Sequence, residues 1–115
     1  MKLYCYFREC FIGIMHIGTD EKKMEWVEDE RLSVQAKRFK SFLPLNSSYK
    51  IECFIAERVA DRRRPGVDVW LSQIGCSLQS TDEEIFVKNH GYAVYDMFWC
   101  TTERVEDSLW KKFYG

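Results

Sequence analysis

Apolar and aromatic residues gather into two short runs at the start of the chain. Residues 2–7 and 10–17 are rich in aromatic and β-branched side chains, and the charged pair Arg8 and Glu9 separates them. Runs of this length bounded by polar residues are typical of β-strands joined by a short turn. Neither run alternates cleanly, which indicates that at least one of the strands is covered on both faces. The pattern therefore predicts an N-terminal β-hairpin.

After Glu28 the apolar residues follow the period of a helix. They recur at spacings of four, three and four, which places them on one helix face: Leu32, Ala36, Phe39 and Leu43. The first turn would be acidic and the last turns basic, as the helix dipole favours. Pro44 cannot continue a helix. The spacing predicts a helix over residues 28–43.

Two later segments alternate between apolar and polar residues, as strands do. Residues 49–59 and residues 67–74 both show this period of two, and the segment between them ends in Pro65-Gly66, a pair suited to a type II turn. With the loop centred near residue 63, apolar side chains face one another and Arg58 faces Asp68 across the outer face. The pattern predicts a second β-hairpin.

The outer face and the tip of this second hairpin carry candidate binding residues. Phe54 and Trp70 would lie diagonally on the outer face, where a helix covers them or where they form an exposed aromatic platform. Arg62, Arg63 and Arg64 would form the tip, as solvated charges or as guanidinium groups that grip a phosphate or carboxylate.

The C-terminal third is expected to add two helices and a strand. Thr81 and Glu84 form a capping box, and Gly91 can end the resulting helix, Asp82 to His90, in a left-handed conformation. A nearly continuous apolar strand, Tyr92 to Cys100, and a final helix, Glu103 to Tyr114, follow.

Two features of this C-terminal region stand out. Asp96 is a lone charge inside the apolar strand, and it is expected to block edge pairing, to partner a buried arginine or to belong to a site. Trp110 and Tyr114 make the apolar stripe of the last helix wider than one core contact requires, which favours an interface.

These elements together predict a single α+β domain over residues 1–115. The expected order is ββ-α-ββ-α-β-α, with about five strands in an antiparallel or mixed sheet and three helices packed on it. The composition of 46% hydrophobic and 30% charged residues fits an ordinary soluble globule. The net charge of -1 argues against a basic nucleic-acid or membrane-surface protein.

Neither a membrane span nor a signal peptide is expected, because the longest uncharged run near the N-terminus has ten residues. A cytoplasmic location follows as the expectation. The five cysteines lack paired spacing and are expected to be reduced thiols.

Cysteine and histidine allow two chemical hypotheses, and neither is favoured. A zinc site would use Cys5, Cys10 and His16 but lacks a fourth ligand. A nucleophilic triad would use Cys100, His90 and Asp96, at distances that the sequence does not fix. No common nucleotide-binding or hydrolase motif is present. We therefore expect no catalytic residues, no metal and no cofactor.

The leading functional hypothesis is a small interaction module without catalysis, such as an inhibitor, an immunity-type binder or a self-associating adaptor. Its partner would be another protein or a second copy, bound through Phe54 with Trp70 or through Trp110 with Tyr114. The first alternative is a single-stranded nucleic-acid binder, which would add Arg58 and the three tip arginines for phosphate and which the net charge disfavours. A small thiol enzyme is the second alternative.

Overall fold

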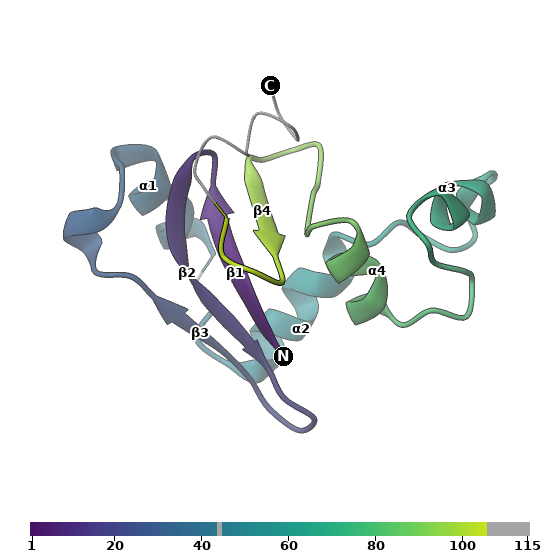
Figure 1. Cartoon of the computed structure of the whole chain (residues 1–115), viewed down its shortest axis with the longest axis horizontal. Coiled ribbons are helices and arrows are strands. Elements are labelled where there is room, and N and C mark those ends of the chain that lie inside the picture. The colour runs from purple at the N-terminus through teal and green to yellow at the C-terminus, as the bar shows by residue number, and fades with distance from the viewer. Residues whose placement is uncertain (44, 106–115) are drawn as a thin grey trace.

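A four-stranded antiparallel sheet forms the centre of the molecule (Figure 1). The computed structural model describes residues 1–43 and 45–105. The strands are β1 (Lys2–Phe7), β2 (Cys10–Ile17), β3 (Lys22–Trp26) and β4 (Phe98–Thr101), and their order in the sheet is β3-β2-β1-β4. Strand β4 is the last of the described strands in sequence, yet it pairs with β1, the first, in the same sheet.

Helices occupy the long segment between β3 and β4. They are the 3-10 turn η1 (Asp29–Arg31), α1 (Val34–Phe42), α2 (Ser48–Glu57), α3 (Val67–Gln73) and α4 (Asp82–Lys88). The α+β class and the single compact domain agree with the sequence prediction, whereas the number and order of the elements differ.

The N-terminal hairpin is confirmed, with both strands at the expected residues. Arg8 adopts a positive φ of 53° in its turn. Strand β3 extends this hairpin into a three-stranded meander and was not predicted. A weak signal for it exists, because Lys22, Met24 and Trp26 alternate with the exposed Lys23 and Glu25.

The helix predicted over residues 28–43 is confirmed in its buried face but not in its start. Leu32, Ala36 and Phe39 are buried as expected. The regular helix begins at Val34, because the Ser33 side chain accepts a hydrogen bond from the Ala36 N–H and caps it.

The prediction that residues 49–59 form a strand is wrong, because Ser48–Glu57 form helix α2. Ser47 caps this helix by accepting from the Lys50 N–H. The buried residues Ile51, Phe54 and Ile55 follow helical spacing, which alternation at 51, 53 and 55 had concealed.

The expected partner strand is also wrong, and with it the second hairpin. Residues 67–73 form helix α3, whose buried residues are Val67 and Leu71. The turn itself forms: Gly66 has φ 81° and ψ 0°, and the Val67 N–H donates to the Arg64 carbonyl. These are the features of a type II turn, here placed before a helix instead of between strands.

Helix α4 is confirmed at its N-terminus, where Thr81 accepts from the Glu84 N–H. Its C-terminal turn ends at Gly91, which has φ 64° and donates its N–H to the Phe86 carbonyl. The strand expected over residues 92–100 is confined to Phe98–Thr101, and residues 92–97 form a loop. Residues 103–105 are not helical, and the rest of the expected final helix lies outside the described residues.

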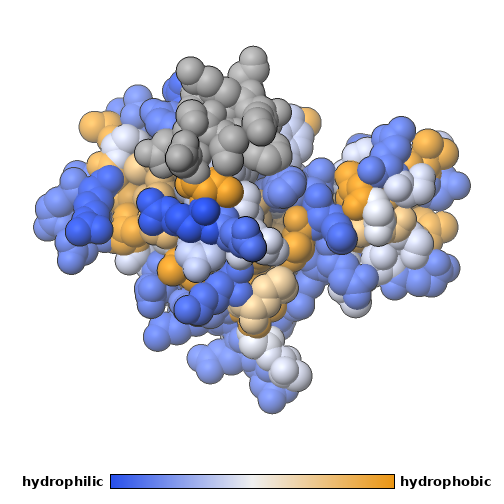
Figure 2. Space-filling view, viewed as in Figure 1, coloured by the Kyte–Doolittle hydropathy of each residue, from blue (hydrophilic) through white to orange (hydrophobic). Residues whose placement is uncertain are grey.

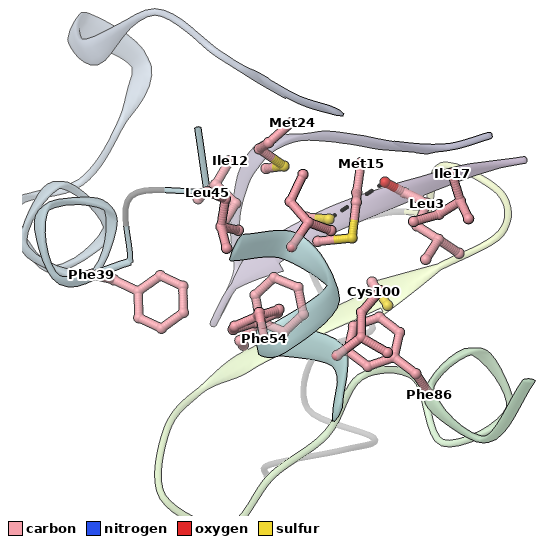
Figure 3. Close-up of a cluster of buried hydrophobic side chains, with 14 of the residues drawn as sticks. Leu3, Ile12, Met15, Ile17, Met24, Phe39, Leu45, Phe54, Phe86 and Cys100 are labelled. Atoms are coloured by element: carbon pink, nitrogen blue, oxygen red, sulfur yellow. Dashed lines mark hydrogen bonds between the residues drawn. The ribbon is translucent and has the colours of Figure 1, made fainter. Parts of the chain in front are cut away.

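Two groups of buried side chains stabilise this arrangement. The larger fills the space between one face of the sheet and the helices α1, α2 and α4, and Figure 3 shows Phe39, Phe54 and Phe86 directed toward the strand residues. The smaller joins α3 to α4 through Val67, Leu71 and Ile85. Helix α3 therefore stands apart from the sheet on a small core of its own (Figure 1).

Candidate functional site

A groove of about 580 Å³ lies where the end of α2, the start of α3 and the loop after α4 come together. We call it the α3 groove. One wall is helix α3 with Trp70, and the opposite wall is the segment 92–95, which includes two tyrosines. The view in Figure 2 shows the α3 lobe standing out from the body, with apolar patches on its surface.

The floor of the α3 groove contains a buried arginine, Arg58. Its side chain is only 1% exposed, and it makes a bidentate ion pair with Asp96, with N–O distances of 2.6 and 2.8 Å. Its Nε donates to the Gly91 carbonyl at 2.6 Å. Three of its donors are thus satisfied, as a buried charge requires.

Aromatic rings surround the same guanidinium group. Its central carbon lies 4.9 Å from the ring centre of Phe54, 5.0 Å from that of Phe98 and 5.4 Å from that of Tyr95. Asp96 also accepts a hydrogen bond from the Phe98 N–H. Arg58 therefore connects α2, the 91–96 loop and the start of β4, and we call this set of contacts the Arg58 latch.

The latch decides between the open interpretations of two sequence features. Asp96 partners a buried arginine, which was one of its three expected roles, and it is not a charge on a strand edge. The expected cross-strand pair of Arg58 with Asp68 is wrong, because both residues lie on helices or their ends, and Asp68 is exposed.

The rim above the latch is apolar and exposed. Val94 is 86% exposed and Tyr95 is 66% exposed, although both belong to the segment that Arg58 holds. Across the groove, Trp70 is half-buried against the small α3 core. Large apolar side chains thus face solvent on a backbone that is fixed at Gly91 and at Asp96.

The three tip arginines have separate roles. Arg62 donates to the Asp82 carboxylate at 2.8 Å and to the Ser80 carbonyl at 2.6 Å, which ties the segment before α3 to the start of α4. Arg63 is 91% exposed and pairs with Asp61, and its guanidinium holds the pKa of the Asp61 carboxyl below its ordinary value. Arg64 lines the α3 groove.

The structure does not bring Phe54 and Trp70 together as an aromatic platform. Phe54 is buried in the large core, where its ring packs edge-on against Phe98, whereas Trp70 lines the groove from a different helix. The stacking surface of Phe54 and Trp70 that the nucleic-acid hypothesis requires is therefore absent from the described residues. Trp110 and Tyr114 lie outside the described residues.

A second hollow of about 550 Å³ lies between α2 and the start of α4. Lys22 enters it from β3 and forms ion pairs with Glu52 at 3.1 Å and with Glu83 at 2.9 Å. The pKa of Lys22 is raised above its ordinary value, mainly by the hydrogen bond to Glu83. The one cation and the two carboxylates pair with each other, so these charges join β3 to α2 and α4 and serve a structural role.

The cysteines and histidines do not assemble into the arrangements considered from the sequence. Cys100 and Cys5 are buried opposite each other on β4 and β1, and burial raises the pKa of the Cys5 thiol to about 12. Burial also raises the pKa of Cys100 well above its ordinary value, which keeps this thiol protonated.

The other two residues of the triad considered from the sequence, His90 and Asp96, have different partners. The contact of His90 Nδ1 is with the carbonyl oxygen of Cys100, at 3.1 Å, and not with the Cys100 sulfur. Asp96 pairs with Arg58. Among residues 1–43 and 45–105, no three His, Cys, Asp or Glu side chains are grouped as metal ligands.

Sequence reasoning named Arg58, Arg64 and Trp70 but missed the groove wall formed by residues 92–95. One signal for this wall exists in the sequence. If residues 48–58 are taken as a helix, Arg58 lies seven residues after Ile51 on the buried face, and Asp96 is a carboxylate available to pair with it.

No protein-family model, curated protein or solved structure matches this chain. Within the described part of the chain, no helix has both the length and the apolar character needed to cross a membrane.

Proposed function

We propose that this protein is a non-catalytic interaction module that binds a short apolar segment of another protein in the α3 groove. The observation that carries the proposal is the apolar rim on a fixed backbone, in which Val94 and Tyr95 face solvent beside the buried Arg58 latch. Large apolar side chains that are exposed but held in place are typical of binding surfaces.

Rigidity at the rim favours binding. A partner that docks on a flexible loop must first order it, and that ordering lowers the affinity. Here the Arg58 guanidinium holds the loop at Gly91 and Asp96 before any partner arrives. Tyrosine and tryptophan also lose little conformational entropy when buried and are enriched among the residues that dominate binding energy.

The charges of the groove suit a peptide better than a nucleic acid. Glu57 and Arg64 line it with opposite signs, and Asp61 is paired with the exposed Arg63. A phosphate backbone is bound through several uncompensated cations, whereas Arg58 and Arg62 already have carboxylate partners. An apolar segment flanked by polar groups fits this lining.

A randomised peptide library selected on the purified protein tests the proposal. We expect enrichment of peptides with a large apolar residue, and binding that is lost in Trp70→Ala and in Tyr95→Ala. Truncation of such an anchor costs about 2 kcal/mol or more of binding, which is about thirtyfold in affinity. Phe42→Ala is the matched control, because Phe42 is an exposed aromatic residue on α1, outside the groove.

Crosslinking provides a second measurement in the natural host. A photoreactive residue at position 94 should capture a discrete partner protein, and the same residue at position 34, an exposed valine on α1, should not. Equal crosslinking at both positions, or selected peptides that bind Trp70→Ala and Tyr95→Ala normally, would contradict the proposed function.

A further inference from the structure

The face of the sheet that points away from the large core is aromatic near the β1–β2 turn. Side chains alternate between the two faces of a strand. In β1, Cys5 belongs to the large core, so its neighbours Tyr4 and Tyr6 lie on the other face. Tyr6 pairs with Phe11 of β2 and with Trp99 of β4, which lie beside it on that face. We call Tyr4, Tyr6, Phe11 and Trp99 the outer aromatic patch.

Two residues of this patch are fully buried, although they belong to neither core. Tyr6 and Trp99 are both 0% exposed, and neither is a member of the two groups of core side chains. Their rings stack with centres 4.2 Å apart. A sheet face that is buried needs a layer of chain packed on it, and α1, α2 and α4 pack on the opposite face. The outer aromatic patch therefore has a cover of its own.

The last described residues of the chain lie on this patch. The Val105 N–H donates to the Tyr6 hydroxyl at 2.9 Å, and the central carbon of the Arg104 guanidinium lies 3.8 Å from the ring centre of Phe11. In Figure 1 the segment after β4 crosses in front of β1, and α2 lies behind the sheet. Residues 102–105 thus form the first part of the cover and direct the following chain onto the patch.

The remaining residues, 106–115, have the composition and the length that a cover requires. They include four large apolar side chains: Leu109, Trp110, Phe113 and Tyr114. Ten residues span about 33 Å when extended and about 15 Å as a helix. Strands β2 and β4 lie on either side of β1 and are therefore about 10 Å apart. The segment can cross the patch in either conformation.

We propose that residues 106–115 dock on the outer aromatic patch of their own chain and complete its cover. The contacts of Arg104 and Val105 hold the start of the segment at the patch, so the segment acts at a high effective concentration. Burial of its apolar side chains against aromatic rings stabilises the docked arrangement. The proposal assigns Trp110 and Tyr114 to a contact within the chain, in place of the partner surface expected from the sequence.

Hydroxyl-radical labelling of the full chain, analysed by mass spectrometry, tests this cover. Tyr6 and Trp99 should be protected in the wild type. The double variant Leu109→Glu/Phe113→Glu replaces two apolar side chains with charges, which are costly to bury against aromatic rings. Labelling of Tyr6 and Trp99 should then increase by about tenfold or more, because each lost apolar contact shifts the docking equilibrium. Unchanged protection in this variant would overturn the proposal.

Two controls separate release of the segment from unfolding of the protein. Lys111→Gln/Lys112→Gln changes the net charge of the same segment by the same amount and should leave Tyr6 and Trp99 protected. Cys5, on the core face of β1, should stay unreactive toward a thiol reagent in both double variants. Equal labelling of the two variants would mean that apolar contacts do not hold the segment. A reactive Cys5 would mean that the segment supports the whole fold. Either result contradicts the proposal.

Photocrosslinking identifies what the segment contacts. A photoreactive residue in place of Trp110 should crosslink to β1, β2 or β4, and one in place of the exposed Val69 on α3 should not. A mixture of isotopically heavy and light chains shows whether the two crosslinked segments belong to one chain. Crosslinks between heavy and light chains would mean that a second copy supplies the cover, and crosslinks to another protein would mean that a partner supplies it. Both results refute docking within the chain.

This inference is independent of the proposed function. Leu109→Glu/Phe113→Glu should keep peptide binding in the α3 groove, and Trp70→Ala should keep Tyr6 and Trp99 protected. A chain that binds no peptide but protects Tyr6 and Trp99 would contradict the proposed function alone. A chain that binds peptide but leaves these two residues unprotected would contradict the docked segment alone.

Discussion

The two walls of the α3 groove come from regions that differ in how they are stabilised. The 92–95 wall is held against the large core by Arg58, whose guanidinium lies over the core rings of Phe54 and Phe98. Among the described residues this core contains sixteen buried side chains, fourteen of them on the four strands and on α1, α2 and α4. The α3 wall rests on three buried residues, Val67, Leu71 and Ile85, with a few half-buried neighbours. Fewer buried contacts mean a lower free energy of local opening.

This difference suggests a division of roles within one site. The latched wall presents Val94 and Tyr95 in a fixed position, because Arg58 is bonded to the backbone at Gly91 and to the side chain of Asp96. The α3 wall can adjust, because seven helical residues on a small core separate more easily from the rest. A groove with one fixed and one adjustable wall can accept segments that differ in size.

Removal of the latch is expected to have the largest effect on stability. Arg58→Ala leaves the half-enclosed Asp96 carboxylate without its partner and removes a bond to Gly91, and breaking a buried ion pair costs about 3–5 kcal/mol. Thermal unfolding should show a large decrease in midpoint. Asp96→Asn should cause a decrease of the same order, and the double variant should lose less than the sum of the two, because the two residues interact directly.

Gly91→Ala is expected to have an effect of similar size. Gly91 has φ 64°, and an added Cβ would lie 2.9 Å from atoms of Phe86 and of Phe98 and 3.0 Å from the Cys100 sulfur. Backbone strain and overpacking each cost about 1–3 kcal/mol, so we expect a loss of about 2–6 kcal/mol in chemical denaturation.

Gly75→Ala gives a matched control for Gly91→Ala. Gly75 has a similar φ of 80°, but an added Cβ there would meet no atom within 4 Å. The variant should show the backbone strain without the overpacking. Equal losses in the two variants would mean that the crowding around Gly91 has no energetic effect.

Leu71→Ala tests whether the α3 region opens separately. Truncation of a buried leucine costs about 2–5 kcal/mol, and we expect a value near 2 here because the α3 core is small. The loss should be local. Cys76, which packs beside α3, should react faster with a thiol reagent, while Cys5 and Cys100 in the large core should remain unreactive. Faster reaction of all three thiols would show that the two regions unfold together.

Alkaline pH should destabilise the large core specifically. Cys5 has a pKa of about 12 in the folded protein against an ordinary value of 9.0. The unfolded chain therefore loses this proton first, so the contribution of Cys5 to stability is constant below pH 9 and falls as the pH rises toward 12. At pH 10.5 the loss from Cys5 is about 2 kcal/mol, at 1.36 kcal/mol per pH unit. Denaturant titrations of the wild type and of Cys5→Ala should diverge progressively above pH 9, reaching this difference at pH 10.5.

The sequence predicts local signals well and fails where one pattern fits two structures. The N-terminal hairpin, the buried face of α1, the Thr81 cap and the Gly91 terminus each depend on neighbouring residues, and all four are present. Residues 48–57 satisfy both periods, because Ile51 and Ile55 are separated by four residues, a spacing common to a strand face and a helix face.

For the candidate site, the individual residues were more predictable than their arrangement. The sequence marks Asp96 as a charge in an apolar segment and Arg58 as a possible phosphate ligand. The two residues are 38 positions apart in the chain, so nothing in the sequence links them. Their pairing depends on how α2 packs against β4, which no local pattern specifies. The type II turn at Gly66 shows the same limit, because its geometry was predictable and the element that follows it was not.

The smallest effects are expected at the tip arginines, and they distinguish contacts that join the two regions from contacts that do not. Arg62→Ser removes hydrogen bonds to Asp82 and to the Ser80 carbonyl that tie the segment before α3 to α4, and we expect a loss of about 1 kcal/mol. Within the described part of the chain, Arg63 pairs with Asp61, two residues before it, at an exposed site, so Arg63→Ser should leave the unfolding midpoint unchanged. Hydrogen exchange of the α3 amides should accelerate in Arg62→Ser but not in Arg63→Ser, because only Arg62→Ser weakens the attachment of α3. Equal exchange rates in the two variants would show that the small core holds α3 without help from Arg62.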